Sequence, residues 1–178
     1  IDDSSASVLL YSKRSSRNSI DSVIPSVKAE ILYHVLLLSA IQTLEQEAQS
    51  VAGLTAFSDE RFDKAVQVVH HCAGRLVVSG IGKSAIIAQK IVATLNSTGT
   101  PSLYMHAADA IHGDLGMVQP DDVVMVISKS GDSPEIKVLG PLLKGFGNTL
   151  IGMVGNMNSY LAKQANIILN TTVTQEAC

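Results

Sequence analysis

The chain has 178 residues, of which 46% are hydrophobic, 16% charged and 4% aromatic, with 13 glycines and no tryptophan. This length suits one domain with a single core, and the composition excludes a disordered tail, a collagen-like repeat and a coiled coil. The formal net charge is -3, so the chain lacks the general basic field that holds nucleic acid or an anionic membrane surface. We therefore expect no nucleic acid and no membrane among its partners.

Cysteine usage and hydropathy are typical of a cytoplasmic protein. The two cysteines, Cys72 and Cys178, are too few for a disulfide framework or a cysteine-based zinc site. The longest strongly apolar stretch, residues 31–41, is about half the length that spans a bilayer. The first residues are acidic and polar, unlike a secretory signal.

The N-terminal third is predicted to hold a leader and two helices. Residues 1–26 include nine serines and show little periodicity, so we expect a leader that is poorly ordered or not native. Residues 27–51 carry apolar side chains at three- and four-residue intervals, which predicts an amphipathic helix. Ser58 is the expected N-cap of a second helix that ends near Gly74. Residues 27–178 are expected to form one domain.

Short apolar runs alternate with helical segments through the rest of the chain. Runs typical of strands buried on both faces of a parallel sheet occur at 76–79, 123–128, 150–154 and 166–170. Helices are expected at 84–97, 134–146 and 158–165, and a shorter extended piece at 102–105. This order predicts an α/β fold, a three-layer αβα sandwich with a mostly parallel central sheet, preceded by an N-terminal helix. Ligands of such folds bind in the loops at the carboxyl ends of the strands.

The loop after the first strand contains Gly80, Gly82, Lys83 and Ser84. Two glycines let the backbone approach a ligand closely, and the amides of the following helix point toward it, which favours an anion site. Val77 stands where a Walker A loop requires glycine, so hydrolysis of nucleoside triphosphates is disfavoured. A dinucleotide-binding turn and a plain strand-to-helix turn remain alternatives.

The loop after the 123–128 strand is the strongest signal in the chain. It places Ser128, Ser130 and Ser133 around Gly131, just before a helix. Hydroxyls and unpaired helix amides together can bind a phosphate monoester. The alternative is an ordinary serine-capped turn, with Pro134 at the first helical position.

Histidines are considered for acid–base chemistry and for metal binding. His112 lies beside Asp114 in a glycine-flanked loop, where it can serve acid–base chemistry or recognise a hydroxyl, or can be part of a structural pair. His70, His71 and His106 lack a matching cluster of acids or thiols, so no metal site is expected.

Five motifs in order resemble one known family. They are G-x-G-K-S, S-T-G-T-P, H-G-D-L-G-M, S-x-S-G-x-x-x-E and Q-E-A-C, which together cover about residues 44–178. This set is similar to the sugar isomerase (SIS) domain of D-arabinose 5-phosphate isomerases, which have a flavodoxin-like sandwich. The resemblance implies interconversion of D-ribulose 5-phosphate and D-arabinose 5-phosphate through an enediol(ate), for 3-deoxy-D-manno-octulosonate in lipopolysaccharide or capsule synthesis. It also implies a homo-oligomer, dimeric or tetrameric, without a cofactor.

The resemblance also implies roles for individual residues. The catalytic group would be Lys83, which contacts substrate oxygens, the glutamates Glu135 and Glu176, and His112 as a substrate contact. The substrate-binding group, which includes the phosphate-binding serines, would be Gly82, Ser84, Ser97, Thr98, Ser128, Ser130, Gly131 and Ser133.

The chain departs from the family pattern in two places. Ala85 stands where the family usually has glycine, which adds one methyl group to the phosphate loop. Similar proteins continue beyond the Q-E-A-C motif to a His-Pro-Gly-Gly stretch, so we expect a domain truncated at its C-terminus, with low or no activity. The alternative function is a non-catalytic regulatory module that binds a sugar phosphate.

Overall fold

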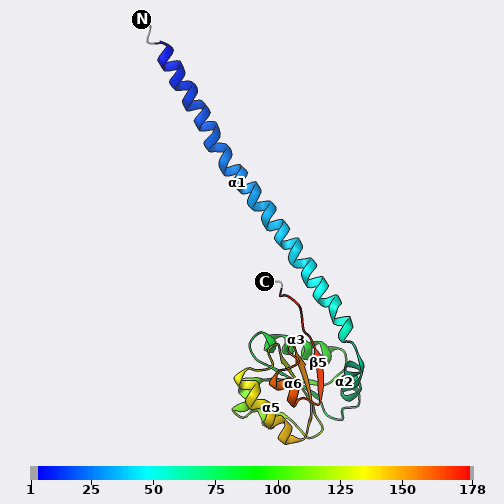
Figure 1. The fold of residues 1–178 in the computed structure, drawn as a ribbon. Coiled ribbons are helices and arrows are strands. Elements are labelled where there is room, and N and C mark those ends of the chain that lie inside the picture. The colour runs from blue at the N-terminus through cyan, green and yellow to red at the C-terminus, as the bar shows by residue number, and fades with distance from the viewer. Residues whose placement is uncertain (1–3, 177–178) are drawn as a thin grey trace. The chain divides into compact units, whose positions relative to one another are not determined.

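A computed structural model describes residues 4–176, with side chains from residue 28 onward (Figure 1). The elements in chain order are α1 (Ser4–Gly53), the 3-10 turn η1 (Leu54–Phe57), α2 (Glu60–His70), β1 (Leu76–Gly80), α3 (Lys83–Ser97), β2 (Ser102–His106), α4 (Ala107–Ile111), the 3-10 turn η2 (Asp114–Met117), β3 (Val123–Ser128), α5 (Pro134–Phe146), β4 (Thr149–Val154), α6 (Tyr160–Gln164) and β5 (Ile167–Asn170).

Helix α1 differs from the sequence prediction at its N-terminal end. We expected a leader up to residue 26 and a helix from residue 27, whereas one helix covers Ser4–Gly53. Serine is only a moderately poor helix former, and extending an existing helix requires no new nucleation, so a serine-rich composition does not by itself end a helix. Residues 4–49 form one unit, and the compact unit begins at Ser50.

Helix α2 begins one residue later than the sequence suggested. The N-cap is Asp59 rather than Ser58, because the Asp59 carboxylate accepts a hydrogen bond from the backbone N–H of Arg61 at 2.9 Å. The Arg61 guanidinium also bonds to the same carboxylate at 2.6 Å. These contacts lower the pKa of Asp59, the side-chain hydrogen bond from Arg61 having the largest effect.

The five strands form one parallel sheet in the order β2-β1-β3-β4-β5. This is the flavodoxin-like order of doubly wound folds. Central strands β1 and β3 are buried along their whole length. Continuous runs of valine, isoleucine and methionine therefore mark the centre of the sheet, as the sequence predicted.

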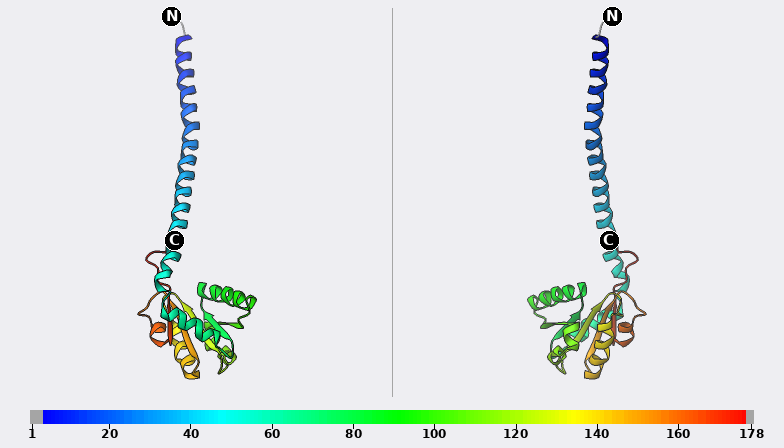
Figure 2. Two further views of the ribbon diagram at one scale, coloured as in Figure 1. Left: turned by 90° about the vertical axis from the view of Figure 1, so that its right-hand side faces the viewer. Right: turned by 90° about the vertical axis from the view of Figure 1, so that its left-hand side faces the viewer.

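Helices cover both faces of the sheet (Figure 1, Figure 2). Alternate strand residues pack into two cores, one on each face. Val77 and Val124 face the core built with α4, α5 and α6. Leu76 and Val78 face the core built with α2 and α3. Each fully buried side chain of this size contributes about 1.5–3 kcal/mol to folding. The predicted three-layer α/β sandwich is confirmed.

The strand order fixes where a ligand can approach. From β1 the chain passes to β2 on one side, and β3 then pairs with β1 on the other. The loops after β1 and β3 therefore separate at the carboxyl ends of these strands, which is the position of the ligand crevice in open α/β sheets. These two loops are among the three that the sequence selected, the third being the loop of His112.

Candidate active site at the carboxyl edge of the sheet

The loop after β1 brings the backbone close to the first turn of α3. A Cβ atom on Gly80 would lie 2.9 Å from the carbonyl carbon and oxygen of Ser84, so only glycine fits there. Gly82 is the N-cap of α3, with a φ of 57°, and has no side chain to occupy the helix amides. Lys83 is exposed at the first helical position, and Ser84 is half-buried. The loop thus offers helix N–H groups and one cation to an anion.

Ala85, where the family usually has glycine, lies in the first turn of α3. Its side chain is buried. The backbone N–H of Ala85 donates to the carbonyl of Gly82 at 3.1 Å, which closes the first turn of the helix.

The loop after β3 holds three serine hydroxyls at the start of α5. Ser128 Oγ is buried and accepts a hydrogen bond from the Gly131 N–H at 3.0 Å. Ser130 Oγ accepts one from the Asp132 N–H at 3.3 Å. In both serines the hydroxyl proton stays available for donation to a ligand.

Ser133 is the N-cap of α5 but makes no side-chain capping bond. Its Oγ is buried, and it has no hydrogen-bond partner among residues 28–176. Buried hydroxyls are seldom left unpaired in proteins. An orphaned hydroxyl at the start of a 13-residue helix fits a site that binds a polar, anionic group.

Helix α6 packs against the serine loop. Gly131 has a φ of 67°, and its carbonyl accepts the Leu161 N–H at 3.0 Å. The Tyr160 N–H donates to the Asp132 carboxylate at 3.2 Å. A Cβ atom on Gly131 would lie 2.2 Å from Ser159 Oγ. This packing fixes the loop conformation that presents the serines.

Glu135 lies in the first turn of α5, after Pro134 at the first helical position. A carboxylate there is stabilised by the helix dipole. This also fits the alternative interpretation of the loop as an ordinary capped turn. Its side chain is half-buried and it follows the serine loop directly. This placement fits a structural role, and the catalytic role of Glu135 stays a prediction.

Glu176 lies far from β3 in sequence, yet its carboxylate pairs with the ammonium group of Lys129. Lys129 is the main reason that the pKa of Glu176 lies below its usual range, and Lys83 adds a smaller electrostatic attraction. Lys83, at the end of the loop after β1, thus interacts electrostatically with Glu176. Lys129 was absent from the predicted set, although a cation between two serines of a phosphate-binding loop was a usable signal.

Two predicted residues, Ser97 and Thr98, lie near the amino ends of the strands, opposite the carboxyl edge of the sheet. Ser97 and Thr98 end α3, whereas Gly82 and Lys83 begin it, and 15 helical residues span about 22 Å. Their hydroxyls donate to the Thr94 carbonyl at 2.7 and 3.0 Å. Since the next strand, β2, starts a few residues later, these hydroxyls lie near the amino ends of the strands. The structure therefore does not bring them together with the other predicted site residues.

His112 is exposed and is the C-cap of the short helix α4. Its backbone N–H donates to the Asp109 carbonyl at 2.9 Å. Helix α4 directly follows β2, so His112 belongs to the carboxyl edge of the sheet. Its role as a substrate contact stays a prediction.

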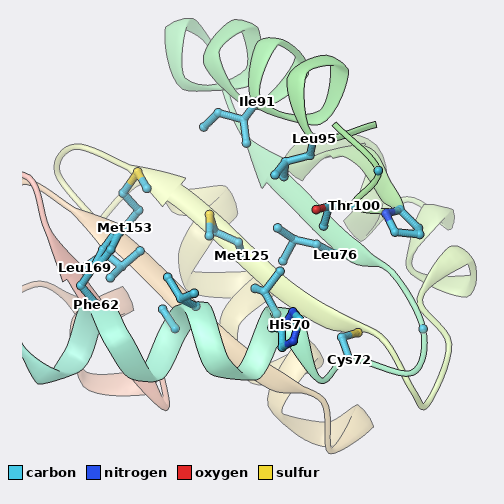
Figure 3. Close-up of a pocket in the computed structure, with 16 residues that line it drawn as sticks. Phe62, His70, Cys72, Leu76, Ile91, Leu95, Thr100, Met125, Met153 and Leu169 are labelled. Atoms are coloured by element: carbon cyan, nitrogen blue, oxygen red, sulfur yellow. The ribbon is translucent and has the colours of Figure 1, made fainter. Parts of the chain in front are cut away.

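A hollow lies elsewhere, between α2 and α3 over one face of the sheet (Figure 3). It measures about 540 Å³ and is lined mainly by apolar side chains, among them Phe62, Leu95, Met125 and Leu169. None of the predicted site residues lines it. An apolar hollow of this kind does not suit a sugar phosphate, so the loops at the carboxyl edge remain the candidate site.

Among the side chains of residues 28–176, no three His, Cys, Asp or Glu gather as metal ligands would. None of the helices described in residues 4–176 combines the length and the apolar character that crossing a bilayer requires.

Comparison with known proteins decides the family. The family model of the SIS domain matches residues 71–178, which is more than half of the chain. The chain belongs to the SIS domain family. Its relatives in that family include arabinose 5-phosphate isomerase KdsD of Pseudomonas aeruginosa, 49% identical over 140 residues, and arabinose 5-phosphate isomerase KpsF of Escherichia coli O6:H1, 39% identical over 156 residues. The resemblance read from the motifs is confirmed.

The two matches cover most of this chain but less than half of each relative. They cover 79% and 87% of this SIS chain, but 43% and 48% of the two relatives. The chain thus spans less than half the length of these curated relatives. A solved structure of an Escherichia coli CFT073 protein, in complex with arabinose 5-phosphate, has a TM-score of 0.76 and 39% identity. That match covers 80% of this chain and 76% of the other.

Proposed function

We propose that the chain is the catalytic part of an aldose–ketose isomerase that interconverts D-ribulose 5-phosphate and D-arabinose 5-phosphate. The observation that carries this proposal is the orphaned Ser133 hydroxyl within the serine loop, in a chain 39% identical to a protein solved with arabinose 5-phosphate. The names of the curated relatives support the same substrate.

The phosphate end of the substrate would bind between the loops after β1 and β3. Its oxygens would accept hydrogen bonds from Ser84, Ser128, Ser130 and Ser133 and from the first amides of α3 and α5. Lys83 stands at the start of α3, where its ammonium group can offset negative charge on the sugar oxygens.

The reaction moves one proton between C1 and C2. Removal of the C2 proton of the aldose leaves an enediolate. Return of a proton to C1, with transfer of the hydroxyl proton from O2 to O1, gives the ketose, so no electrons leave the substrate and no redox cofactor is required. We assign the proton transfer and the orientation of the sugar hydroxyls to the two glutamates, Glu135 and Glu176. His112 is proposed as a further substrate contact.

The isomerisation is tested by incubating the chain with D-arabinose 5-phosphate in D2O and following the ketose by NMR. Turnover should place deuterium at C1 of the ketose, and Glu135→Gln should lower kcat by about 100-fold or more, the scale of losing an acid–base group. Glu60→Gln, at the exposed start of α2, is the control and should keep full activity. Binding without turnover would favour the regulatory sugar-phosphate module if a longer chain that includes the His-Pro-Gly-Gly stretch of similar proteins is inactive too, and absence of both would contradict the proposal.

We also propose that the protein acts in the cytoplasm as a homo-oligomer, a dimer or a tetramer. Helix α1 exposes large apolar side chains, including Ile31, Leu36 and Leu38. Clusters of exposed apolar residues of this size usually mark contacts with another protein surface. Sedimentation at micromolar concentration tests the oligomer, and a monomer there would contradict it.

A further inference from the structure

Lys129 and Glu176 connect the ends of two strands that are not neighbours in the sheet. Lys129 directly follows β3, and Glu176 lies six residues after the end of β5, with β4 between them. Their side chains form an ion pair although both are more than half exposed. An exposed ion pair of this kind contributes little free energy by itself. Backbone contacts are therefore needed to hold the two segments near each other.

The backbone provides such a support. The Gly155 N–H, after β4, donates to the Lys129 carbonyl at 3.0 Å. After β5, the Thr171 N–H donates to the Val154 carbonyl at 2.8 Å, and the Thr172 hydroxyl lies 2.9 Å from the Gly155 carbonyl oxygen. Three successive loops are thereby joined, and the segment that carries Glu176 is directed across β4 toward the serine loop.

The contact between Gly155 and Lys129 is close. A Cβ atom on Gly155 would lie 3.0 Å from the Lys129 carbonyl oxygen and 3.1 Å from its Cγ. A glycine at this position therefore lets the lysine stem lie against the loop after β4. The ammonium group reaches Glu176 from there.

Lys129, from the loop after β3, forms the ion pair with the Glu176 carboxylate, and Lys83, at the start of α3, adds a smaller electrostatic attraction. Both lower the pKa of this carboxyl, Lys129 more strongly. Lys129 also stands between Ser128 and Ser130, whose hydroxyls we assign to the phosphate. The cation thus links the carboxylate to the phosphate-binding loop.

We propose that Lys129 is a positioning residue of the isomerase site, whose ammonium group holds the Glu176 carboxylate beside the serine loop. This role rests on the proposed function, because Glu176 acts on the sugar only if the phosphate lies in that loop. Lys129 acts through Glu176 and takes no part in the proton transfer.

The kinetic test compares Lys129→Gln, Lys129→Arg and Lys144→Gln, the last at an exposed position near the end of α5. With Lys129→Gln we expect kcat to fall by about fivefold, the scale of one exposed ion pair, with little change in KM. The acid limb of the kcat/KM profile should move to higher pH, since the pKa of Glu176 rises when its main cation is removed. Arginine should restore both, and the Lys144 control should change neither. An unmoved acid limb would overturn the proposal.

A second measurement does not depend on turnover. The carboxyl carbon of Glu176 is followed by NMR during an acid titration of the free protein. Its midpoint should lie higher in Lys129→Gln than in the unsubstituted chain, and should return with arginine. If the unsubstituted chain does not isomerise the sugar but this midpoint moves, the proposed function fails and the ion pair stands. If the midpoint does not move, the role of Lys129 is refuted whatever the activity.

Discussion

Replacement of Gly131 by alanine should destabilise the domain more than any other glycine substitution in the serine loop region. With a φ of 67°, alanine there costs about 1–2 kcal/mol in backbone energy. The added Cβ would also lie 2.2 Å from Ser159 Oγ and 2.5 Å from Ser159 Cβ. Overpacking of this kind costs about 1–3 kcal/mol, so we expect a total loss of about 2–5 kcal/mol.

Alanine substitutions at two further glycines distinguish the backbone cost of Gly131→Ala from its steric cost. Gly147 has a φ of 82° but open space around it, so Gly147→Ala should lose only the backbone part, about 1–2 kcal/mol. Gly145 lies inside α5 with open space, so Gly145→Ala should leave the free energy of unfolding unchanged or raise it by about 0.5–1 kcal/mol. All three are measured by urea unfolding followed by circular dichroism.

The steric part has a direct check in a double substitution. Ser159→Gly removes both atoms that the new methyl group would meet, and as an N-cap glycine costs only a few tenths of a kcal/mol. Gly131→Ala should therefore cost less in the Ser159→Gly background. The reasoning is refuted if Gly131→Ala is no more destabilising than Gly147→Ala, or if its cost is the same in both backgrounds.

Three other predictions concern the phosphate, the buried Asp122 and the acid stability. Replacing Ser128 and Ser130 together by alanine should weaken binding of arabinose 5-phosphate, measured by calorimetry, by about 1–3 kcal/mol; unchanged affinity would place the phosphate elsewhere. Asp122→Ala should lower the free energy of unfolding in urea by about 2–4 kcal/mol, because its buried carboxylate accepts from two backbone N–H groups. The stabilisation from Asp59 is complete above its ordinary carboxyl pKa and disappears as pH falls through its lower folded pKa, so Asp59→Asn should flatten the acid limb of stability against pH. An identical limb in both proteins would contradict this.

The sheet could be predicted from the sequence because each strand is a local signal. Residues 123–128 are all apolar or small and β-rich, and β3 has those bounds in the structure. Helix α5 was equally clear, since Pro134 marks its start and Gly147, in the left-handed conformation, its end. The five-residue helix α4 was missed because it is too short to show helical periodicity.

Two features of the candidate site depend on how the chain is arranged in space. Ser97 and Thr98 follow a site helix in sequence, but the length of α3 carries them to the other edge of the sheet. Lys129 and Glu176 are 47 residues apart, and only the path of the chain through β4 and β5 brings them together. Local patterns contain neither helix length in space nor strand order, so these features required the structure.

The position of β5 at the edge of the sheet has a consequence for the proposed function. Among the described strands this four-residue strand pairs with β4 alone, so it should open at lower denaturant than the central strands. Opening of β5 would release the segment that carries Glu176 and leave the serine loop between β3 and α5 in place. If the serine loop binds the phosphate and Glu176 acts on the sugar, as we propose, a partly destabilised protein should still bind a sugar phosphate after it has lost turnover. Amide hydrogen exchange in β5 should then follow the loss of activity rather than the loss of affinity.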